Sequence, residues 1–441
     1  MEIGQRAITN QPVDALRTNP RNARTHSKHQ IRQIAKSIQE FGWTNPILVD
    51  AEQQIVAGHG RVEAAKLLGI KEVPTIRLDR LTKEQIRAYV IADNKLAENA
   101  GWDREMLAIE LGSLLAIENL DFDVTITGFE VPEIDLLLQD DKQSPAAEDE
   151  LPAISTDQVP VTQVGDLWQL GKHRIFCGNS LSADSFEKLL GANHAAAVFT
   201  DPPYNVKIDG HATGNGAIKH REFEMASGEM TETEFTQFLN QSLCLLAQFS
   251  VANSVHYLCI DWRHAGELLA AGRQNYDEFL NLCVWVKDNG GMGSFYRSQH
   301  ELVFVFGKGA THRNNILLGK FGRYRTNVWQ YPGIQTLSKQ SEEGNLLALH
   351  PTVKPVAMVV DAILDCTVHG EIVLDAFLGS GTTLMAAERV GRVARGIEID
   401  PLYVDVAIRR WQKFTGGEAV HSATGKRFGE IEAAQKEIAY V

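Results

Sequence analysis

The segment from Ile372 to Asp400 constrains the fold of this chain more than any other. It has the pattern of a strand that ends at Asp375, a Gly379-Ser380-Gly381 turn, a helix, and a second strand that leads to Glu398. Glycines let a backbone approach a ligand closely, and Glu398 stands at the spacing at which a carboxylate meets ribose hydroxyls in a nucleoside-binding βαβ unit. No Gly-Lys-Ser/Thr follows the turn, which excludes a P-loop, and the incomplete G-x-G-x-x-G disfavours a nicotinamide cofactor.

The residues before this segment continue the same pattern. A hairpin is predicted over residues 164–180, and strands are predicted at 195–199, 255–260, 282–286 and 302–306, with helical stretches between several of them. Strands that alternate with helices predict an α/β fold whose sheet is mainly parallel and covered on both faces.

A second stretch with chemical character is Asp201-Pro202-Pro203-Tyr204, which follows the apolar strand at 195–199. Two consecutive prolines stop the strand and stiffen the turn, so the Asp201 carboxylate is held at a strand end. A carboxylate and a nearby carbonyl can accept the two N–H bonds of a ring-bound amino group, while the Tyr204 ring stacks on the ring face. Taken alone, the four residues also fit a proline-rich surface turn.

Four motifs in order resemble those of the amino-group DNA methyltransferases that use S-adenosylmethionine. Residues 201–204 are similar to their catalytic motif, and residues 375–383 are similar to their cofactor loop. Residues 350–355 resemble the segment that closes over the cofactor, and residues 396–400 resemble the next strand. The catalytic motif precedes the cofactor motif, which is the beta arrangement. The resemblance covers about residues 160–415 and implies a Rossmann-like methyltransferase domain.

The resemblance also implies a role for individual residues. The implied catalytic residues are Asp201, Pro202, Pro203 and Tyr204. The implied cofactor-binding residues are Asp375, Phe377, Gly379, Ser380, Gly381, Thr382, Glu398, Lys354 and Asn179. Asn179 departs from the family pattern, because relatives more often have Asp there. The implied cofactor is S-adenosyl-L-methionine, and no metal ion is expected.

These residues predict direct methyl transfer to an exocyclic amine. Hydrogen bonds to Asp201 and to the Pro202 carbonyl favour a pyramidal nitrogen, and Tyr204 holds the base, which must leave the duplex stack. Asp at the first motif position resembles the adenine-N6 enzymes, whereas Ser is more usual for cytosine N4. Adenine N6 is therefore the predicted target and cytosine N4 the alternative. Transfer to cytosine C5 is disfavoured, because none of the five cysteines follows a proline.

Basic residues interleaved with aromatic residues and glycines lie between the catalytic and cofactor motifs, where beta-type relatives place target recognition. This pattern suits phosphate contact and base stacking. We predict a target-recognition segment over about residues 206–345, with a loop beside the site at 206–227. The candidate DNA-binding residues are Lys287, Arg297, His300, Arg323 and Arg325. For any one of them, a solvated face or a core position is the alternative.

The first 130 residues predict a separate, smaller α+β module. Gly58-His59-Gly60-Arg61 joins a predicted strand to a predicted helix, which suits a phosphate group and equally suits a tight turn that needs glycine. Residues 10–100 resemble the ParB/sulfiredoxin-like domain through Asn19-Pro20-Arg21-Asn22 and the glycine box. The resemblance implies phosphate binding by Gly58, His59 and Arg61. The partition proteins have Glu-Arg-Arg in the box, so nucleotide hydrolysis is in doubt here.

The stretch between the modules is rich in acids, alanine, serine and proline, which is typical of a flexible linker. The predicted domains are therefore a ParB-like domain at 1–130, an acidic linker at 131–160 and a methyltransferase domain at 161–430.

Composition narrows the class of protein further. A net charge of −13 excludes a uniformly basic nucleic-acid binder, and no apolar run is long enough for a membrane span. The N-terminus has no signal-peptide pattern, and the cysteines are scattered, without a C-x-x-C pair. A cytoplasmic protein without disulfides, structural zinc or a membrane partner is expected.

The implied partners are double-stranded DNA, a nucleotide in the N-terminal domain and, by resemblance alone, a second copy of the chain. Restriction-modification is a setting compatible with such an enzyme. The rival class is a ParB-like DNA-binding switch with an inactive methyltransferase domain, which the intact Asp201, Tyr204 and Glu398 oppose. RNA or protein-glutamine methylation is less favoured, since glutamine enzymes prefer Asn at position 201. A nuclease is disfavoured, since residues 1–100 show no paired-carboxylate metal site.

Overall fold

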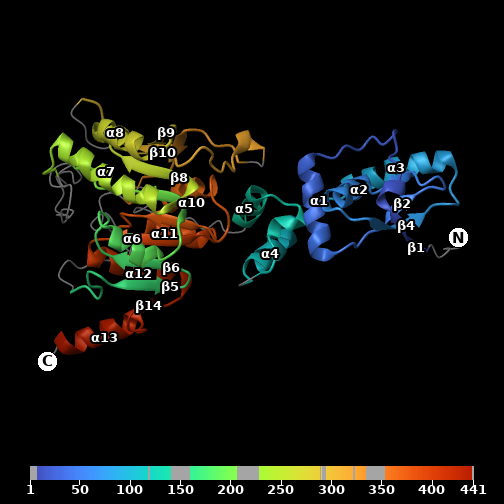
Figure 1. Ribbon diagram of the computed structural model, residues 1–441. Coiled ribbons are helices and arrows are strands. Elements are labelled where there is room, and N and C mark those ends of the chain that lie inside the picture. Colours follow the sequence, from blue (N-terminus) through green and yellow to red (C-terminus); the bar gives the residue numbers. More distant parts are fainter. Residues whose placement is uncertain are drawn as a thin grey trace. The chain divides into compact units, whose positions relative to one another are not determined.

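The computed structural model describes residues 7–117, 120–140, 159–205, 228–288, 290, 295–320, 323–333 and 353–439. The chain divides into two compact units, residues 1–141 and 142–441, and each has its own hydrophobic core (Figure 1). Among the described residues, no helix is long and apolar enough to cross a membrane.

The smaller unit is an α+β structure, as the resemblance implies. Its elements are β1 (Ile8–Pro12), η1 (Val13–Ala15), α1 (Lys28–Phe41), β2 (Ile47–Val49), β3 (Ile55–Ala57), α2 (His59–Leu68), β4 (Glu72–Arg77), α3 (Lys83–Glu98), α4 (Arg104–Leu115), η2 (Val124–Thr127) and α5 (Val131–Asp140). The strands form a sheet in the order β1-β4-β2-β3, in which β2 and β4 are parallel and the other pairs are antiparallel. Ile47, Ile55 and Val62 are fully or almost fully buried in the core of this unit.

Local sequence signals set the helix ends in this unit. Thr82 and Gln85 bond each other's backbone in a complete capping box at the start of α3, and the Ser27 side chain caps α1. Gly69 ends α2 in the left-handed conformation that glycine adopts without strain.

The linker predicted at residues 131–160 begins too early, because residues 131–140 form helix α5. Ile134 and Leu137 of this helix are buried in a cluster shared with α4. Apolar side chains at helical spacing thus outweigh the acidic character of the stretch. Residues 141–158, most of the predicted linker, lie outside the described residues.

The larger unit is built on one ten-stranded sheet. Its elements are β5 (Leu167–Leu170), β6 (His173–Cys177), α6 (Ala183–Leu190), β7 (Ala195–Thr200), α7 (Glu232–Gln248), β8 (Ser250–Ile260), η3 (Trp262–His264), α8 (Ala265–Asn275), β9 (Glu278–Val286), β10 (His300–Gly307), η4 (Leu317–Gly319), β11 (Val328–Gln330), α10 (Val356–Leu364), β12 (Ile372–Asp375), α11 (Thr382–Arg389), β13 (Val393–Glu398), α12 (Pro401–Thr415), β14 (Ala419–His421) and α13 (Phe428–Ala439). The strand order is β11-β9-β10-β8-β7-β12-β13-β6-β5-β14.

The centre of this sheet is parallel, as predicted, and its flanks are mostly antiparallel. Strands β8, β7, β12, β13 and β6 run parallel to their neighbours in this group. The hairpin of β5 and β6 and the pairs of β10 with β8 and β9 are antiparallel. Because the carboxyl ends of parallel strands meet at one edge, the ends of β7, β12 and β13 lie together there.

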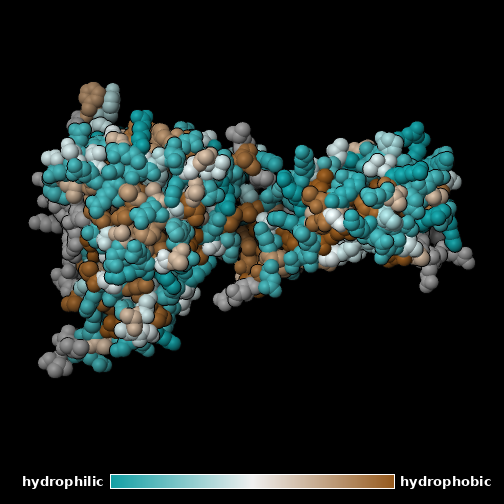
Figure 2. All heavy atoms as spheres, viewed as in Figure 1, coloured by the Kyte–Doolittle hydropathy of each residue, from teal (hydrophilic) through white to brown (hydrophobic). Residues whose placement is uncertain are grey.

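Helices cover both faces of the sheet, because successive residues of the central strands enter different cores. Phe199 and Val373 belong to the cluster formed with α10, α11 and α12. Val198 and Leu374 belong to the cluster formed with α6, α7 and α8. The α/β Rossmann-like class predicted for this unit is confirmed. Hydrophilic residues dominate the surface of the molecule that Figure 2 shows.

Much of the segment predicted for target recognition, residues 206–345, belongs to this core instead. Helices α7 and α8 and strands β8, β9 and β10 fall within it, and they bury side chains such as Phe235, Leu258 and Phe304. The predicted segment included these apolar core strands because basic residues flank them in the sequence. The predicted loop at 206–227 and residues 334–345 lie outside the described part of the chain.

Candidate active site

Asp201 lies at the carboxyl end of β7, where the strand stops before Pro202 and Pro203. Its side chain keeps 21% of its exposure, so it is reachable from solvent although its surroundings are enclosed. Burial raises the pKa of the Asp201 carboxyl above its ordinary value, and the neighbouring Lys354 ammonium opposes that shift. The backbone position of Asp201 is therefore rigid, and the ionisation of its carboxyl group depends on the neighbouring charges.

Tyr204 lies against Asp201. Its hydroxyl donates to Asp201 Oδ1 at 2.5 Å and lies 3.2 Å from Glu301 Oε2. Burial, followed by the two carboxylates, raises the pKa of Tyr204 well above its ordinary value, so the hydroxyl stays protonated. Asp201 Oδ1 therefore accepts a hydrogen bond on the side of the site where Tyr204 lies.

Asn205 holds the chain beside Tyr204. Its Oδ1 accepts from the backbone N–H groups of Gly228 (3.0 Å) and Met230 (3.2 Å), and its Nδ2 donates to the Met230 carbonyl at 2.8 Å. Its φ of 52° is one that asparagine tolerates better than most residues. Asn205 thus fixes the point to which the chain returns before α7, a role that sequence analysis did not predict.

Lys354 contacts the catalytic motif, although it was predicted to bind the cofactor. Its Nζ lies 2.5 Å from Asp201 Oδ2 and 3.0 Å from Glu301 Oε2, and the residue is 4% exposed. Burial alone would lower the pKa of Lys354, but the two carboxylates raise it, so the ammonium stays charged. In this structure the partners of Nζ are thus the carboxylates of Asp201 and Glu301, and the implied cofactor role of Lys354 stays a prediction.

Glu301 is the acid of β10 that completes this cluster. Lys287 forms an ion pair with Glu301 Oε1, and its ammonium also lies 4.8 Å from the centre of the Trp285 ring. Burial would raise the pKa of Glu301, but Lys354 and Lys287 hold it at about 2. Lys287, predicted to contact DNA, is thus paired inside the site.

Asp375 ends β12 and is held by three hydrogen bonds. Its Oδ1 accepts from Thr200 Oγ1 at 2.7 Å and from the Phe377 N–H at 3.1 Å, and its Oδ2 accepts from Thr383 Oγ1 at 2.7 Å. Burial raises the pKa of Asp375 to about 6, against these hydrogen bonds. In this structure Asp375 therefore organises the loop after β12.

Glu398 ends β13 and supports the same loop. Its Oε2 accepts from the Gly379 N–H at 2.8 Å, and its Oε1 accepts from the Asp400 N–H at 2.9 Å. Burial raises the pKa of Glu398 to about 7. Gly381 starts α11 with a φ of 87°, and an added Cβ would lie 2.9 Å from Ala407 Cβ, so only glycine fits there.

The remaining predicted cofactor residues surround this loop. Phe377 is half-buried with its ring centre 5.9 Å from that of Phe238, and Ser380 is buried. The Thr382 hydroxyl donates to the Lys354 carbonyl at 3.4 Å. Asn179 is exposed, and its Oδ1 accepts from the Leu181 N–H at 2.8 Å, which closes a turn after β6.

The residues at this sheet edge fit S-adenosylmethionine. A half-buried aromatic ring, a glycine loop with left-handed residues and the Glu398 carboxylate suit a nucleoside. The carboxylates of Asp201 after β7 and Glu398 at the end of β13, on the two sides of β12, favour a positively charged sulfonium. Within the described residues, no group of three or more His, Cys, Asp or Glu side chains could hold a metal ion.

Two predicted DNA contacts are buried ion pairs instead. Arg323 is 5% exposed, and its Nη2 lies 2.6 Å from Asp365 Oδ1. Arg325 Nε lies 3.1 Å from Asp365 Oδ2, and its Nη1 donates to the Tyr331 hydroxyl at 2.9 Å. Asp365, at the end of α10, is buried and therefore requires cationic partners. The local sequence around Arg323 and Arg325 gives no sign of this distant partner.

Arg297 and His300 are accessible to a ligand, since Arg297 is exposed and His300 is half-buried. Arg297 is exposed beside Phe295 and Tyr296, which are 86% and 81% exposed and lie in edge-to-face contact at 4.6 Å. His300 is half-buried at the start of β10. Large exposed aromatic side chains next to a cation are typical of a surface that receives a partner.

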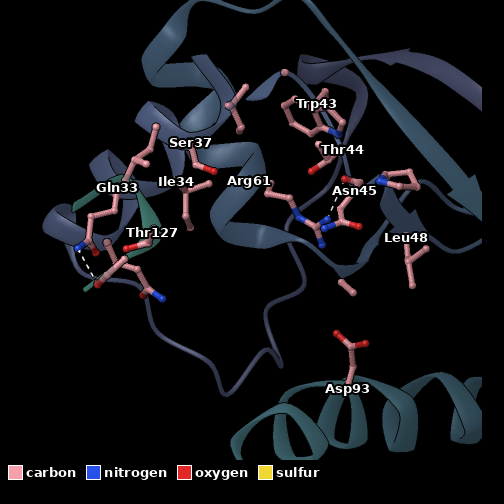
Figure 3. A pocket seen from close by; sticks show the side chains of 17 residues that line it. Gln33, Ile34, Ser37, Trp43, Thr44, Asn45, Leu48, Arg61, Asp93 and Thr127 are labelled. Atoms are coloured by element: carbon pink, nitrogen blue, oxygen red, sulfur yellow. Dashed lines mark hydrogen bonds between the residues drawn. The ribbon is translucent and has the colours of Figure 1, made fainter. Parts of the chain in front are cut away.

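In the smaller unit, one of the three predicted phosphate-binding residues, Arg61, lines a cavity. The cavity has a volume of about 750 Å³, and Arg61 Nη1 donates to the Asn45 carbonyl at 2.8 Å. Figure 3 shows Arg61 from α2 and Asp93 from α3 pointing into this cavity. Gly58 begins α2 with a φ of 101°, and neither Gly58 nor His59 lines the cavity.

Comparison with known proteins identifies three parts of the chain. Family models match residues 195–409 (DNA methylase), 2–94 (ParB N-terminal domain) and 105–164 (ParB-methyltransferase HTH domain). The chain therefore contains a DNA methylase domain of the N6/N4 amino-group type, a family that uses S-adenosylmethionine. A ParB N-terminal domain precedes this methylase domain.

Individual relatives cover one part of the chain or the other. The chain is 50% identical over 78 residues to the ParB-like nuclease domain-containing protein YnaK of Escherichia coli (strain K12), which is 18% of this chain and 90% of that protein. It is 23% identical over 266 residues to the type II methyltransferase M.HpaI of Haemophilus parainfluenzae, covering 56% and 77%. Among solved structures, the M1.HpyAVI–SAM complex is 20% identical over 54% of this chain and 97% of that chain, with a TM-score of 0.40.

Sequence analysis missed several parts of this arrangement. The HTH match overlaps the stretch predicted as linker, and its helices α4 and α5 were not predicted. Glu301 was not among the predicted site residues. A single acid beside the apolar run of β10 is a signal that could have identified it, because a buried carboxylate requires a partner.

Proposed function

We propose that this protein is a site-specific DNA methyltransferase that acts on the exocyclic N6 of adenine. The observation that carries the proposal is the position of Asp201. Its carboxylate lies at the end of β7, beside the loop after β12 and next to the Tyr204 ring. Asp as the first residue of the motif supports adenine N6 over cytosine N4.

Each residue of the motif has a distinct task. The Asp201 carboxylate and the Pro202 carbonyl accept the two N–H bonds of the amine, which opposes delocalisation of the nitrogen lone pair into the ring. The Tyr204 ring stacks on the base after its hydroxyl leaves Asp201. Glu398 and the loop from Gly379 to Thr382 hold the cofactor, which supplies an electrophilic methyl group when it is bound. The reaction needs no covalent intermediate with the protein.

Double-stranded DNA is the proposed substrate, and the base is flipped out to reach Asp201. Arg297 with Phe295 and Tyr296 supports contact with the phosphate backbone or unstacked bases. The HTH match at residues 105–164 supports a second DNA contact, and a homodimer is part of the proposal by resemblance.

The N-terminal domain is proposed to bind a nucleotide. The cavity of about 750 Å³ is large enough for such a ligand, and the Arg61 guanidinium supplies a cation at its wall. Calorimetric titration with nucleoside triphosphates tests this role. Arg61→Ala is expected to weaken binding at least about tenfold through loss of one charge-assisted contact. Equal affinity of both proteins would exclude Arg61 from the site.

The deciding experiment for the methyltransferase uses labelled S-adenosylmethionine and unmethylated duplex DNA, with digestion to nucleosides and mass analysis. N6-methyladenine that disappears with Asp201→Ala is the expected result. N4-methylcytosine would retain the mechanism and overturn the choice of base. If the protein binds the cofactor but methylates no DNA, the rival interpretation as a ParB-like DNA-binding switch gains support.

A further inference from the structure

A chain of alternating charges begins at Asp201 of the proposed catalytic motif. Lys354 Nζ contacts Asp201 Oδ2 at 2.5 Å and Glu301 Oε2 at 3.0 Å, and Lys287 pairs with the other oxygen of Glu301. Lys354 comes from the segment before α10, Glu301 from β10 and Lys287 from the end of β9. Residues from three separate parts of the chain therefore form one charge network with Asp201, which follows β7.

We propose that Lys354 is a positioning residue for Asp201 and that Glu301 holds Lys354 in place for this task. The inference rests on the proposed function and deepens it. It assigns to Lys354 a role different from cofactor binding, which its motif implied. It assigns to Glu301 a role where none had been predicted.

Lys354 leaves one oxygen of Asp201 for the substrate. The ammonium takes Oδ2, so the carboxylate cannot rotate, and Oδ1 is left to the Tyr204 hydroxyl at 2.5 Å. The amine of the target base can replace that hydroxyl at Oδ1 without disturbing Lys354. The cation also keeps Asp201 ionised, and a carboxylate accepts hydrogen bonds while a carboxylic acid offers a competing donor.

Glu301 limits how strongly Lys354 neutralises Asp201. The ammonium is shared between two carboxylates, and Lys287 anchors Glu301 from the other side. Without the Glu301 charge, Lys354 would pair with Asp201 alone and withdraw more electron density from the oxygen that accepts the amine. Lys354 and Glu301 together therefore keep Asp201 ionised and leave one of its oxygens able to accept the amine.

The two residues predict opposite changes in the pH dependence of catalysis. The charged and titratable groups that face Asp201 are Lys354 and Glu301, the Tyr204 hydroxyl, the Cys259 thiol of β8 and Asp375 of β12, with Lys287 behind Glu301. Removal of the Lys354 charge should raise the pKa of Asp201 and shift the acidic limb of the kcat profile to higher pH. Removal of the Glu301 charge should shift the same limb to lower pH.

The test compares wild type, Lys354→Met, Lys354→Arg and Glu301→Gln. The measurements are kcat for methyl transfer against pH with saturating DNA and cofactor, the calorimetric Kd for S-adenosylmethionine, and Tm. We expect Lys354→Met to lower kcat about 100-fold at neutral pH with Kd changed less than about threefold, and Lys354→Arg to recover part of the rate. Glu301→Gln keeps the side-chain shape, so it provides the pH test even if Lys354→Met folds poorly.

Lys308→Met is the matched control. Lys308 Nζ donates to the Ser250 carbonyl at 2.6 Å and to the Ala247 carbonyl, and it faces neither Asp201 nor Glu301. Its loss should lower Tm and leave the acidic limb where it is in the wild type.

Three results would overturn the inference. Loss of cofactor affinity with an unchanged kcat would return Lys354 to the cofactor site. Equal losses of rate and Tm in Lys354→Met and Glu301→Gln, with no shift of the acidic limb, would make the cluster purely structural. A wild type that binds the cofactor but methylates no DNA would refute the proposed function itself, and the inference with it.

Discussion

Thr200 donates its hydroxyl hydrogen to Asp375 Oδ1 at 2.7 Å and so joins the carboxyl ends of β7 and β12. Both residues are buried. Thr200 precedes Asp201, the proposed catalytic residue, and Asp375 precedes the glycine loop, so one hydrogen bond couples the two halves of the candidate site. A displacement of either strand end is thereby transmitted to the other.

Thr200→Val should destabilise the larger unit, because it removes a donor from a buried carboxylate while keeping the side-chain volume. We expect a loss of about 1–3 kcal/mol in the free energy of unfolding, measured in urea. Thr233→Val, at an exposed position of α7, is the control and should change it by less than about 0.5 kcal/mol. Equal effects of the two substitutions would show that the link between β7 and β12 contributes nothing.

Asp201→Asn should abolish methyl transfer, because the amide removes the negative charge and places a donor toward the amine. We expect kcat to fall at least about 1000-fold, the scale seen when preorganised electrostatic groups are removed. The calorimetric Kd for S-adenosylmethionine should stay within about fivefold of the wild type. Retention of a tenth of the rate would contradict the role of Asp201 as the acceptor of the amine.

Glu398 should make cofactor affinity dependent on pH. Its pKa of about 7 means that the carboxylate, the better acceptor for ribose hydroxyls, is populated above neutrality. The Kd for S-adenosylmethionine should therefore decrease as the pH rises through about 7. Glu398→Gln should weaken binding about 10- to 100-fold and flatten this dependence. A dependence that persists in the variant would have another origin.

The same shift predicts a change in stability with pH. The pKa of Glu398 rises from an ordinary 4.5 to about 7 on folding, so the folded state binds the proton more tightly than the unfolded state does. The contribution of Glu398 to stability is thus fully present below pH 4.5 and is lost as the pH rises to about 7. Comparing the pH dependence of urea unfolding for wild type and Glu398→Gln isolates this contribution.

Arg323→Met and Arg297→Ala should separate stability from DNA binding. Arg323 is buried against Asp365, so its loss should lower the free energy of unfolding by about 3–5 kcal/mol. Arg297 is exposed, so its loss should leave Tm unchanged and weaken DNA binding, with a smaller dependence on salt concentration. Fluorescence titration of duplex DNA at several salt concentrations measures the second effect. A stable Arg323→Met protein with weak DNA binding would reverse the assignment.

The sequence by itself determined the local elements and the order of the motifs. Periodic apolar residues, the capping box at Thr82 and the glycines after helices predicted most strands and helix ends, because these signals act within a few residues. The strand-turn-helix pattern around Asp375 and the Asp201 motif likewise identified both halves of the site. Helix α5 was missed, since the acidic composition of the predicted linker concealed a short apolar stripe, and α4 was not predicted either.

Only the tertiary structure decided which charged residues are partners. Lys287, Arg323 and Arg325 looked alike in sequence, as bases among aromatic residues, yet one lies against Glu301 and two against Asp365. Lys354 and Asp201 are likewise far apart in sequence and in direct contact in the fold. The physical reason is that the energy of a charge depends on burial and on what lies within a few ångströms, and both depend on how the strands are ordered in the sheet.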